Sequence, residues 1–266
     1  MNHRRKSVLT VVGRILEIWR YPVSSLGGEQ LSFADVSTAG VADDRRFGLI
    51  DSISGVPAAP EKHARWRDAL HLQARSVAGH LPDIVFPDGQ CCSVSDPLLN
   101  ARLSDYFGFP VAIAAHQPID GYSHLPRAPY RHEHFAVHVL TTSSLTRLAE
   151  LRQVDTVDVR RFRPTVLIDT TDTSGFVEKT WIGKELHLGA VSLHAQEETT
   201  RCGMTFISQP GVEDDPEILR TILRNNKRHL GINCSVAIGG TLRVGDALRV
   251  GDKLRLDDAC VIGKKR

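Results

Sequence analysis

Residues 13–21 read GRILEIWRY, a run in which apolar and polar side chains largely alternate. Alternation with a period of two is typical of a half-buried β-strand. Pro22 ends the run, and residues 24–28 (SSLGG) predict a loop. The first half of the chain therefore predicts a succession of short strands, because similar runs return at residues 31–36, 46–51, 69–77 and 84–87.

Asp88 and Gly89 separate two further strand-like runs and predict a hairpin turn. Helices are expected to be few. Thr142 or Ser143 can cap a helix over residues 144–152, and Asp214 and Asp215 favour the start of another helix through its dipole. The expected helices are residues 97–107, 144–152 and 216–225, and the later strands are residues 136–140, 166–169 and 185–195.

Residues 117–134 are rich in Pro, His, Arg and Gly and show no periodicity, which indicates a boundary between two units. The expected domains are residues 10–116 and 135–266, with residues 117–134 as linker. Many short strands with few helices predict a mainly β (α+β) fold. We expect two β-barrel domains that carry a few peripheral helices.

The composition excludes several classes of protein. The 266 residues include 41% hydrophobic and 24% charged side chains with a net charge of +2, which indicates a globular protein with a sizeable core. The balanced charge gives no reason to expect a nucleic acid or a membrane surface as partner. The apolar run at residues 8–12 is too short for a signal peptide, and no run approaches the ~18 apolar residues of a membrane span. We expect a cytoplasmic protein.

The five cysteines include no Cys-x-x-Cys pair, which argues against a disulfide framework or a four-cysteine metal site. Cys202 follows a strand-like run and stands beside Arg201. A neighbouring cation favours thiolate, which is both a nucleophile and a ligand for soft metals. The alternative is a small buried apolar residue, the usual role of a single cysteine.

Arginines also stand at strand or loop ends at Arg46 and Arg163. Guanidinium forks match phosphate, although solvated surface charges are the commoner role of such residues. The even spacing of His132, His134 and His138 would put them on one face of a strand, as a metal site could use. No carboxylate or cysteine pattern completes that site, so surface-loop histidines are favoured. The chain has no nucleophile-elbow, P-loop or dinucleotide-binding motif.

Taken in order, several motifs resemble the MOSC superfamily, and most closely its two-domain branch. That branch includes the mitochondrial amidoxime-reducing component and bacterial hydroxylaminopurine-detoxifying proteins. The resemblance covers nearly the whole chain. It rests on YPVSSL at residues 21–26, DRRFGLID at 44–51, FRPT at 162–165, WIG at 181–183, TRC at 200–202 and GTLRVGD at 240–246.

The resemblance implies a molybdenum cofactor, Mo-molybdopterin, whose metal is bound by Cys202. It also implies that Arg46 and Arg163 anchor the phosphate and the polar edge of the pterin. Two positions depart from the family pattern: Ser24 stands where a lysine is usual, and Thr165 where an asparagine is usual. Ser24 therefore removes one cation from the phosphate site. The remaining positions that match cofactor contacts are Ser25, His134, Phe135, Thr165, Thr200, Arg201 and Asn233.

By the same resemblance, the expected activity is the reduction of N-oxygenated compounds such as hydroxylamines, amidoximes or N-oxides. Pyridoxal phosphate, flavin, haem and an iron–sulfur cluster are not expected in this chain. Electrons would come from a separate flavin, ferredoxin or cytochrome-type protein. Two alternatives remain open. One is sulfur transfer by a persulfide on Cys202 without molybdenum. The other is a specialised biosynthetic enzyme or a cofactor-binding protein of the same fold.

Overall fold

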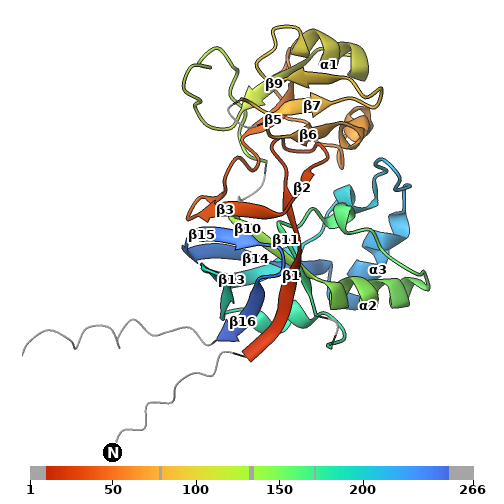
Figure 1. Cartoon of the computed structure of the whole chain (residues 1–266). Helices are drawn as coiled ribbons and strands as arrows, with labels where there is room; N and C mark the ends of the chain where they lie inside the picture. The colour runs from red at the N-terminus through yellow and green to blue at the C-terminus, as the bar shows by residue number, and fades with distance from the viewer. Residues whose placement is uncertain (1–9, 78–79, 132–134, 171, 252–266) are drawn as a thin grey trace, which may run out of the picture.

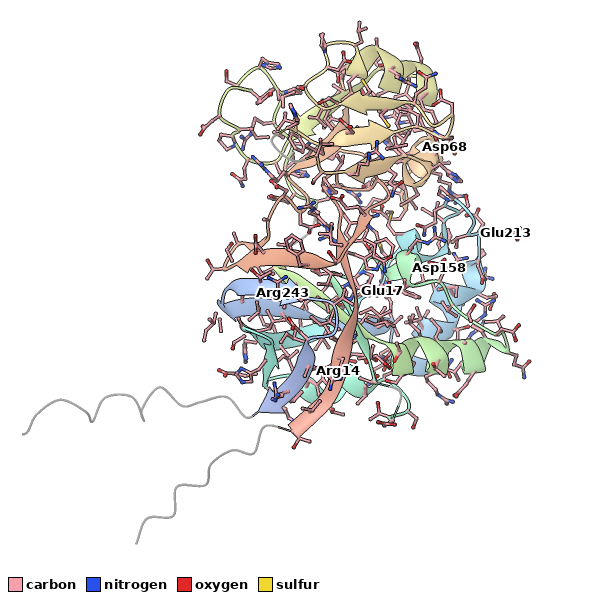
Figure 2. All side chains as sticks on the ribbon, in the orientation of Figure 1. Arg14, Glu17, Asp68, Asp158, Glu213 and Arg243 are labelled. Atoms are coloured by element: carbon pink, nitrogen blue, oxygen red, sulfur yellow. The ribbon has the colours of Figure 1, made fainter. Side chains whose placement is uncertain are left out.

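The computed structural model describes residues 10–77, 80–131, 135–170 and 172–251. It has two lobes, which lie one above the other in Figure 1. Each lobe is built around its own hydrophobic core. Charged side chains such as Asp68, Glu213 and Arg243 are spread over both lobes (Figure 2), in line with the balanced charge.

A closed barrel forms the lower lobe. Strand β1 pairs with β16 on one edge and with β11 on the other, and this second pairing closes the ring. All neighbouring strands in the ring are antiparallel except β10 and β11. In order, the ring contains β1 (Thr10–Arg20), β11 (Val166–Asp169), β10 (Val137–Thr141), β14 (His229–Ile238), β13 (Val191–Thr200), β12 (Glu185–Leu188) and β16 (Ala247–Gly251).

A register shift in β1 explains which of its side chains enter the core. Ile15 and Ile18 are both buried although they are three residues apart. Two residues that far apart would face opposite sides of a regular strand. The shift lies between Ile15 and Glu17 in the pairing with β11, and such a bulge restores the inward direction. The bulge thus lets one strand serve as the closing seam of the barrel.

Short strands extend the barrel toward the upper lobe. Strand β2 (Glu29–Leu31) pairs with the end of β1. Beside it, β3 (Phe33–Ser37) pairs with β4 (Gly40–Val41) and with β15 (Gly240–Arg243). The first strands of the chain are therefore hydrogen-bonded to its last ones.

The upper lobe contains two small sheets. Its core surrounds Trp66, whose ring packs edge-on against Phe107 and Phe109 with centroids 5.1 and 4.8 Å away. One sheet is β5 (Phe47–Asp51) with β9 (Val111–Ala115), and the other is β6 (Gln73–Arg75), β7 (Asp83–Val85) and β8 (Cys91–Ser93). The helices of this lobe are η1 (Ala64–His71) and α1 (Leu99–Phe107).

Helices also cover one side of the barrel (Figure 1). Thr141 caps α2 by accepting a hydrogen bond from the Ser144 amide, and Asp215 caps α3 by accepting one from the Glu217 amide. None of the helices in the described ranges has the length and apolar character needed to traverse a bilayer. The elements are α2 (Thr142–Arg152), α3 (Pro216–Asn226), η2 (Val159–Phe162), η3 (Val177–Trp181) and η4 (Gly203–Phe206).

The predicted mainly β architecture with a few peripheral helices is confirmed. The hairpin at Asp88 and Gly89 joins β7 to β8, with Gly89 at a φ of 83°. The two cores, however, divide the chain differently from the expected ranges. The barrel core takes Ile15, Ile18, Ala34, Val36 and Val41 from the expected first domain. Strand pairing across the chain, rather than the Pro-rich segment, decides where the lobes separate.

Glu178 is a buried carboxylate inside the lower lobe, 2% exposed. Its oxygens accept hydrogen bonds from the hydroxyls of Thr141 and Ser144 and from the Gly231 amide. Burial raises its pKa, and these hydrogen bonds only partly oppose the shift. Glu178 thereby joins the end of β10, the start of α2 and strand β14.

We expect Glu178→Gln to flatten the pH dependence of stability. An acid with a raised folded-state pKa contributes stability that is fully present below its unfolded pKa of about 4.3. That contribution is lost as the pH rises through the folded value, at up to about 1.4 kcal/mol per unit of pKa difference. Urea unfolding of both proteins between pH 4 and pH 8 measures the effect. Glu150→Gln, on the exposed face of α2, is the control and should keep the wild-type profile.

Candidate functional site

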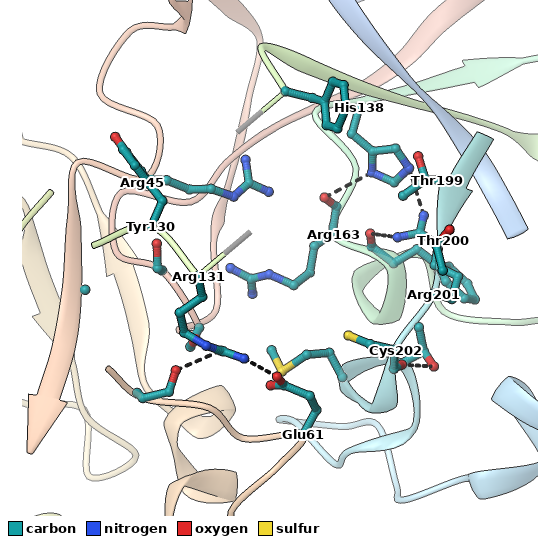
Figure 3. A pocket seen from close by; sticks show the side chains of 18 of the residues that line it. Arg45, Glu61, Tyr130, Arg131, His138, Arg163, Thr199, Thr200, Arg201 and Cys202 are labelled. Carbon is teal, nitrogen blue, oxygen red and sulfur yellow. Dashed lines mark hydrogen bonds and ion pairs between the residues drawn. The ribbon is translucent and has the colours of Figure 1, made fainter. Parts of the chain in front are cut away.

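A cavity of about 460 Å³ lies where the two lobes meet (Figure 3). The upper lobe and the loops next to it contribute Ser24, Ser25, Arg45, Glu61, His116 and Arg131 to its walls, and the barrel side contributes Phe135, His138, Arg163, Thr200, Cys202 and Asn233.

Arg163 enters this cavity from the end of η2. Its Nη1 donates to the Leu26 carbonyl at 2.5 Å, and its guanidinium lies 4.1 Å from the centre of the Tyr21 ring. Its Nη2 is buried and has no partner among the described residues. Burial lowers the pKa of Arg163 to about 10, so the group stays charged at neutral pH. A buried donor of a charged group without an acceptor is costly and favours an anionic ligand.

Arg201 is a second buried guanidinium, 7% exposed. It donates to the Phe162 carbonyl at 3.0 Å and to His138 Nε2 at 2.8 Å, while its Nε has no partner among the described residues. Burial lowers its pKa to about 10. Around the cavity, two cations are thus withdrawn from water without a carboxylate bound to either in the described part of the chain.

His138 is fixed as a neutral ring. An arginine can only donate, so Nε2 must accept from Arg201, which leaves the proton on Nδ1, 3.4 Å from the Arg163 carbonyl. Burial, and next the Arg201 charge, hold the pKa of His138 well below its usual value. His138 therefore orients Arg201 and has no lone pair left for a metal. His132 and His134 lie outside the described residues, within which no cluster of metal-binding side chains occurs.

Cys202 lies between β13 and η4, with its sulfur directed into the cavity in Figure 3. It is half-buried. Its carbonyl accepts hydrogen bonds from the amide and hydroxyl of Thr205, and the amide of Arg201 donates to the Arg228 carbonyl at 2.8 Å. The thiol is thus presented by a backbone that is held on both sides, next to two buried cations.

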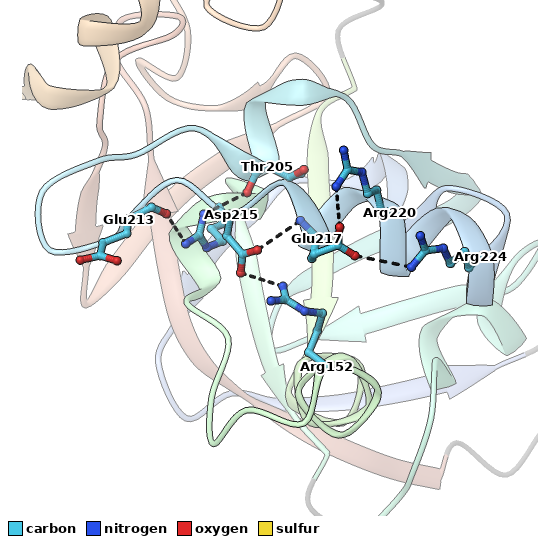
Figure 4. A network of polar contacts seen from close by, with 8 residues as sticks. Arg152, Thr205, Glu213, Asp215, Glu217, Arg220 and Arg224 are labelled. Atoms are coloured by element: carbon cyan, nitrogen blue, oxygen red, sulfur yellow. Dashed lines mark hydrogen bonds and ion pairs between the residues drawn. The ribbon is translucent and has the colours of Figure 1, made fainter.

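The segment after Cys202 is also anchored from the helical side of the barrel. Arg161 donates to the carbonyls of Thr205 and Glu213 at 3.3 and 2.6 Å. Asp215, the cap of α3, pairs with Arg152 of α2 at 2.7 Å (Figure 4). Arg161 thus connects η2 to η4, and the Asp215 amide donates to the Phe206 carbonyl at 2.8 Å, which connects η4 to the start of α3.

The Ser24 hydroxyl is hydrogen-bonded to the ring of His116. The His116 Nδ1 lies 3.0 Å from the Ala128 carbonyl and must donate to it, so Nε2 accepts from the Ser24 hydroxyl, also at 3.0 Å. Tyr130 stacks on the His116 ring with centroids 4.3 Å apart. Burial lowers the pKa of His116. The place where the family resemblance expects a lysine is therefore occupied by a neutral serine–histidine pair.

Most of the residues expected from the sequence lie in this cavity. Thr200 contacts His229, and Asn233 accepts from the Thr199 hydroxyl at 2.8 Å. His134 lies outside the described residues. The expected residues that line the cavity are Ser24, Ser25, Phe135, Arg163, Thr200, Arg201, Cys202 and Asn233.

Two expected residues do not line it. Arg46 pairs with Asp43 at 2.7 Å, is 43% exposed in its side chain and faces a different hollow. Its neighbour Arg45 lines the cavity instead. Regular strand structure begins only at Phe47, after a turn in which Asp43 and Arg45 have positive φ, and the two arginines diverge there. Thr165 is buried behind the wall, where its hydroxyl accepts from the His138 amide at 3.0 Å.

Four further residues line the cavity although the sequence did not predict them: Glu61, His116, Tyr130 and Arg131. The last two belong to the segment expected to be a linker. Only its richness in Arg and His could have pointed to them. Three residues with positive φ, an uncommon conformation for anything but glycine, also line the cavity: Ser25 (70°), Arg45 (49°) and Arg163 (50°).

Comparison with known proteins gives two family matches. The model of the MOSC N-terminal beta barrel domain matches residues 12–65, and that of the MOSC domain matches residues 125–249. No curated protein matches the chain.

Among solved structures, the YuaD protein of Bacillus subtilis is similar with a TM-score of 0.50 at 10% identity, over 91% of this chain and 97% of that one. YiiM of Geobacillus stearothermophilus gives a TM-score of 0.35 at 13% identity, over 44% of this chain and 55% of that one. At 10% identity, the similarity to YuaD shows a shared fold alone.

We expect Arg163→Gln to weaken the binding of inorganic phosphate to the cofactor-free protein by about tenfold or more. The change removes a charged hydrogen-bond donor, worth about 1.5–3 kcal/mol. Arg46→Gln is the matched control, because it removes the same charge from outside the cavity, and it should change the affinity by less than about threefold. Isothermal titration calorimetry measures both. Equal losses in the two variants would show that only overall charge matters.

Proposed function

The chain belongs to the two-domain branch of the MOSC superfamily, and from that premise we propose that it is a molybdenum-cofactor-dependent oxidoreductase that reduces N-oxygenated compounds. MOSC domains are associated with molybdenum-cofactor-binding proteins. The observation that carries the proposal is the pair of buried guanidinium groups, Arg163 and Arg201, beside the thiol of Cys202.

The residues fit an anionic, sulfur-liganded cofactor. Arg163 Nη2 and Arg201 Nε are buried donors without an acceptor in the described part of the chain, and a phosphate or a polar pterin edge would satisfy them. Cys202 offers the soft thiolate that suits molybdenum. Its coordination would also place a negative charge near two cations, which offsets part of their desolvation.

In this proposal each residue has a separate task. Arg163 and Arg201 hold the anionic part of the cofactor, and Cys202 is the ligand of the metal. When bound, the cofactor supplies two-electron oxygen-atom transfer. His138 keeps the Arg201 guanidinium oriented, and it cannot deliver a proton from Nε2 because that atom already accepts a hydrogen bond from Arg201.

Reduction of a hydroxylamine or amidoxime consumes two electrons and two protons and releases the amine or amidine with one water. We assign the electrons to a separate flavin, ferredoxin or cytochrome-type protein, because the sequence carries no motif for a second redox cofactor. The half-buried position of Cys202 keeps the reacting end of the cavity close to the surface, where such a donor could approach.

We expect Cys202→Ser to abolish reduction of amidoximes by an artificial one-electron donor such as reduced methyl viologen. A hydroxyl is a harder and far less acidic ligand than a thiol. Cys91→Ser is the matched control, because Cys91 is exposed in the upper lobe, and it should keep wild-type turnover. Molybdenum and pterin contents are measured in all three proteins.

The same assay separates the alternatives. Unchanged turnover of Cys202→Ser at matched molybdenum content would contradict the proposal. A metal-free wild type with a cyanide-releasable sulfur on Cys202 would support persulfide transfer. Bound cofactor without turnover with any donor would support a carrier protein.

A further inference from the structure

Glu61 brings a carboxylate of the upper lobe to the backbone that follows Cys202. It lies in a turn ahead of η1, closed by hydrogen bonds from the amides of Lys62 and His63 to the Ala59 carbonyl. A Cβ on Gly203 would lie only 3.1 Å from the Cβ of Glu61. Figure 3 likewise draws Glu61 and Cys202 at the same end of the cavity.

Only one oxygen of this carboxylate has a partner. Oε1 pairs with Nη2 of Arg131, whose Nη1 donates to the Ala58 carbonyl at 2.8 Å. Oε2 is buried and accepts no hydrogen bond in the described part of the chain, and the side chain is 6% exposed. An oxygen that has lost water without gaining a donor leaves a place for the donor of a ligand.

The polarity of this end differs from that of the rest of the cavity. Besides Arg131, which pairs with Glu61, the arginines that line the cavity are Arg45, Arg161, Arg163 and Arg201. Among the described lining residues, Glu61 and Glu197 are the acidic ones. Glu197 is exposed and accepts a hydrogen bond from Asn233. Glu61 is therefore the buried acceptor beside Cys202 that is left for a small molecule.

We infer that Glu61, held by Arg131, is the residue that recognises the substrate through an N–H group next to the oxygenated nitrogen. Amidoximes carry an NH₂ group beside the N–OH group, and their amidine products are cations. Tertiary amine N-oxides carry no N–H and gain nothing from Glu61. The inference deepens the proposed function and rests on it for the oxygenated nitrogen, whereas the preference for an N–H donor rests on Glu61 itself.

Binding of benzamidine, measured by isothermal titration calorimetry on the protein as purified, tests the site without any redox reaction. Benzamidine should bind wild type more tightly than the neutral benzamide, which has the same ring and an NH₂ group but no charge. Glu61→Gln should weaken benzamidine binding by about tenfold or more, because a charged hydrogen bond is lost. Glu197→Gln, which removes the same charge from an exposed part of the wall, should change it by less than about threefold.

Steady-state kinetics then link the site to turnover. Glu61→Gln should raise KM for benzamidoxime by a similar factor and leave KM for trimethylamine N-oxide unchanged. Equal benzamidine affinity in wild type and Glu61→Gln, or no preference for benzamidine over benzamide in wild type, would overturn the inference. Normal benzamidine selectivity without reduction of either compound would contradict the proposed reductase and leave the role of Glu61 intact. If Glu61→Gln does not fold, the preference of wild type for benzamidine over benzamide decides.

Discussion

Two guanidinium groups withdrawn from water without a carboxylate partner are the constraint on which the site depends. Arg163 and Arg201 are each held by backbone carbonyls, an aromatic face or a neutral histidine. These partners orient a cation but do not neutralise it, so the cost of burying the charge is only partly offset. The lobes therefore meet around a positive cavity that an anion would stabilise. His138 must remain uncharged for this arrangement to persist, because a protonated ring would face Arg201.

The path of the chain explains why the cavity needs both lobes. The end of β1 leads directly into Ser24 and Ser25, and the barrel that β1 closes also carries Arg163 and Cys202. The upper lobe returns to the same place with Arg45, Glu61 and Arg131. Positive φ at Ser25, Arg45 and Arg163 shows that the backbone accepts uncommon conformations here. At these three positions the backbone departs from the usual negative φ, and the three residues line the cavity.

Many strands and helices were accessible to sequence reasoning because period-two runs, caps and turn residues act locally. The hairpin at Asp88 and Gly89 illustrates this. Helix α2 was also expected, but its cap is Thr141 rather than Thr142 or Ser143. Other elements were not accessible: residues 69–71, expected in a strand, belong to helix η1, and strand β14 was not expected. Long-range pairing was not accessible. Nothing in residues 13–21 indicates that their partners are β11 and β16, more than 140 residues away. The lobes consequently divide elsewhere than at the Pro-rich segment.

The candidate site shows the same limit at the level of side chains. Cys202, Arg163 and Arg201 could be named because their neighbours in sequence carry the pattern. The sequence could not show which of Arg45 and Arg46 enters the cavity, because that depends on an irregular turn that ends only at Phe47. Glu61 carried no sequence signal at all.

Charge is segregated along the cavity, and this gives the site a direction. A bound group with a negative end would place that end at Arg163 and Arg201, whose buried donors lack acceptors among the described residues, and would direct its own N–H donors toward the unpaired oxygen of Glu61. Cys202 lies near both groups of charges. Arg163 and Arg201 are close enough to interact electrostatically with its thiol. The next residue, Gly203, lies close to the Cβ of Glu61. A Cβ at position 203 would lie 3.1 Å from the Cβ of Glu61, so one of the two would have to shift by a few tenths of an ångström. Glycine there therefore allows the carboxylate-bearing turn to approach the backbone next to the thiol closely.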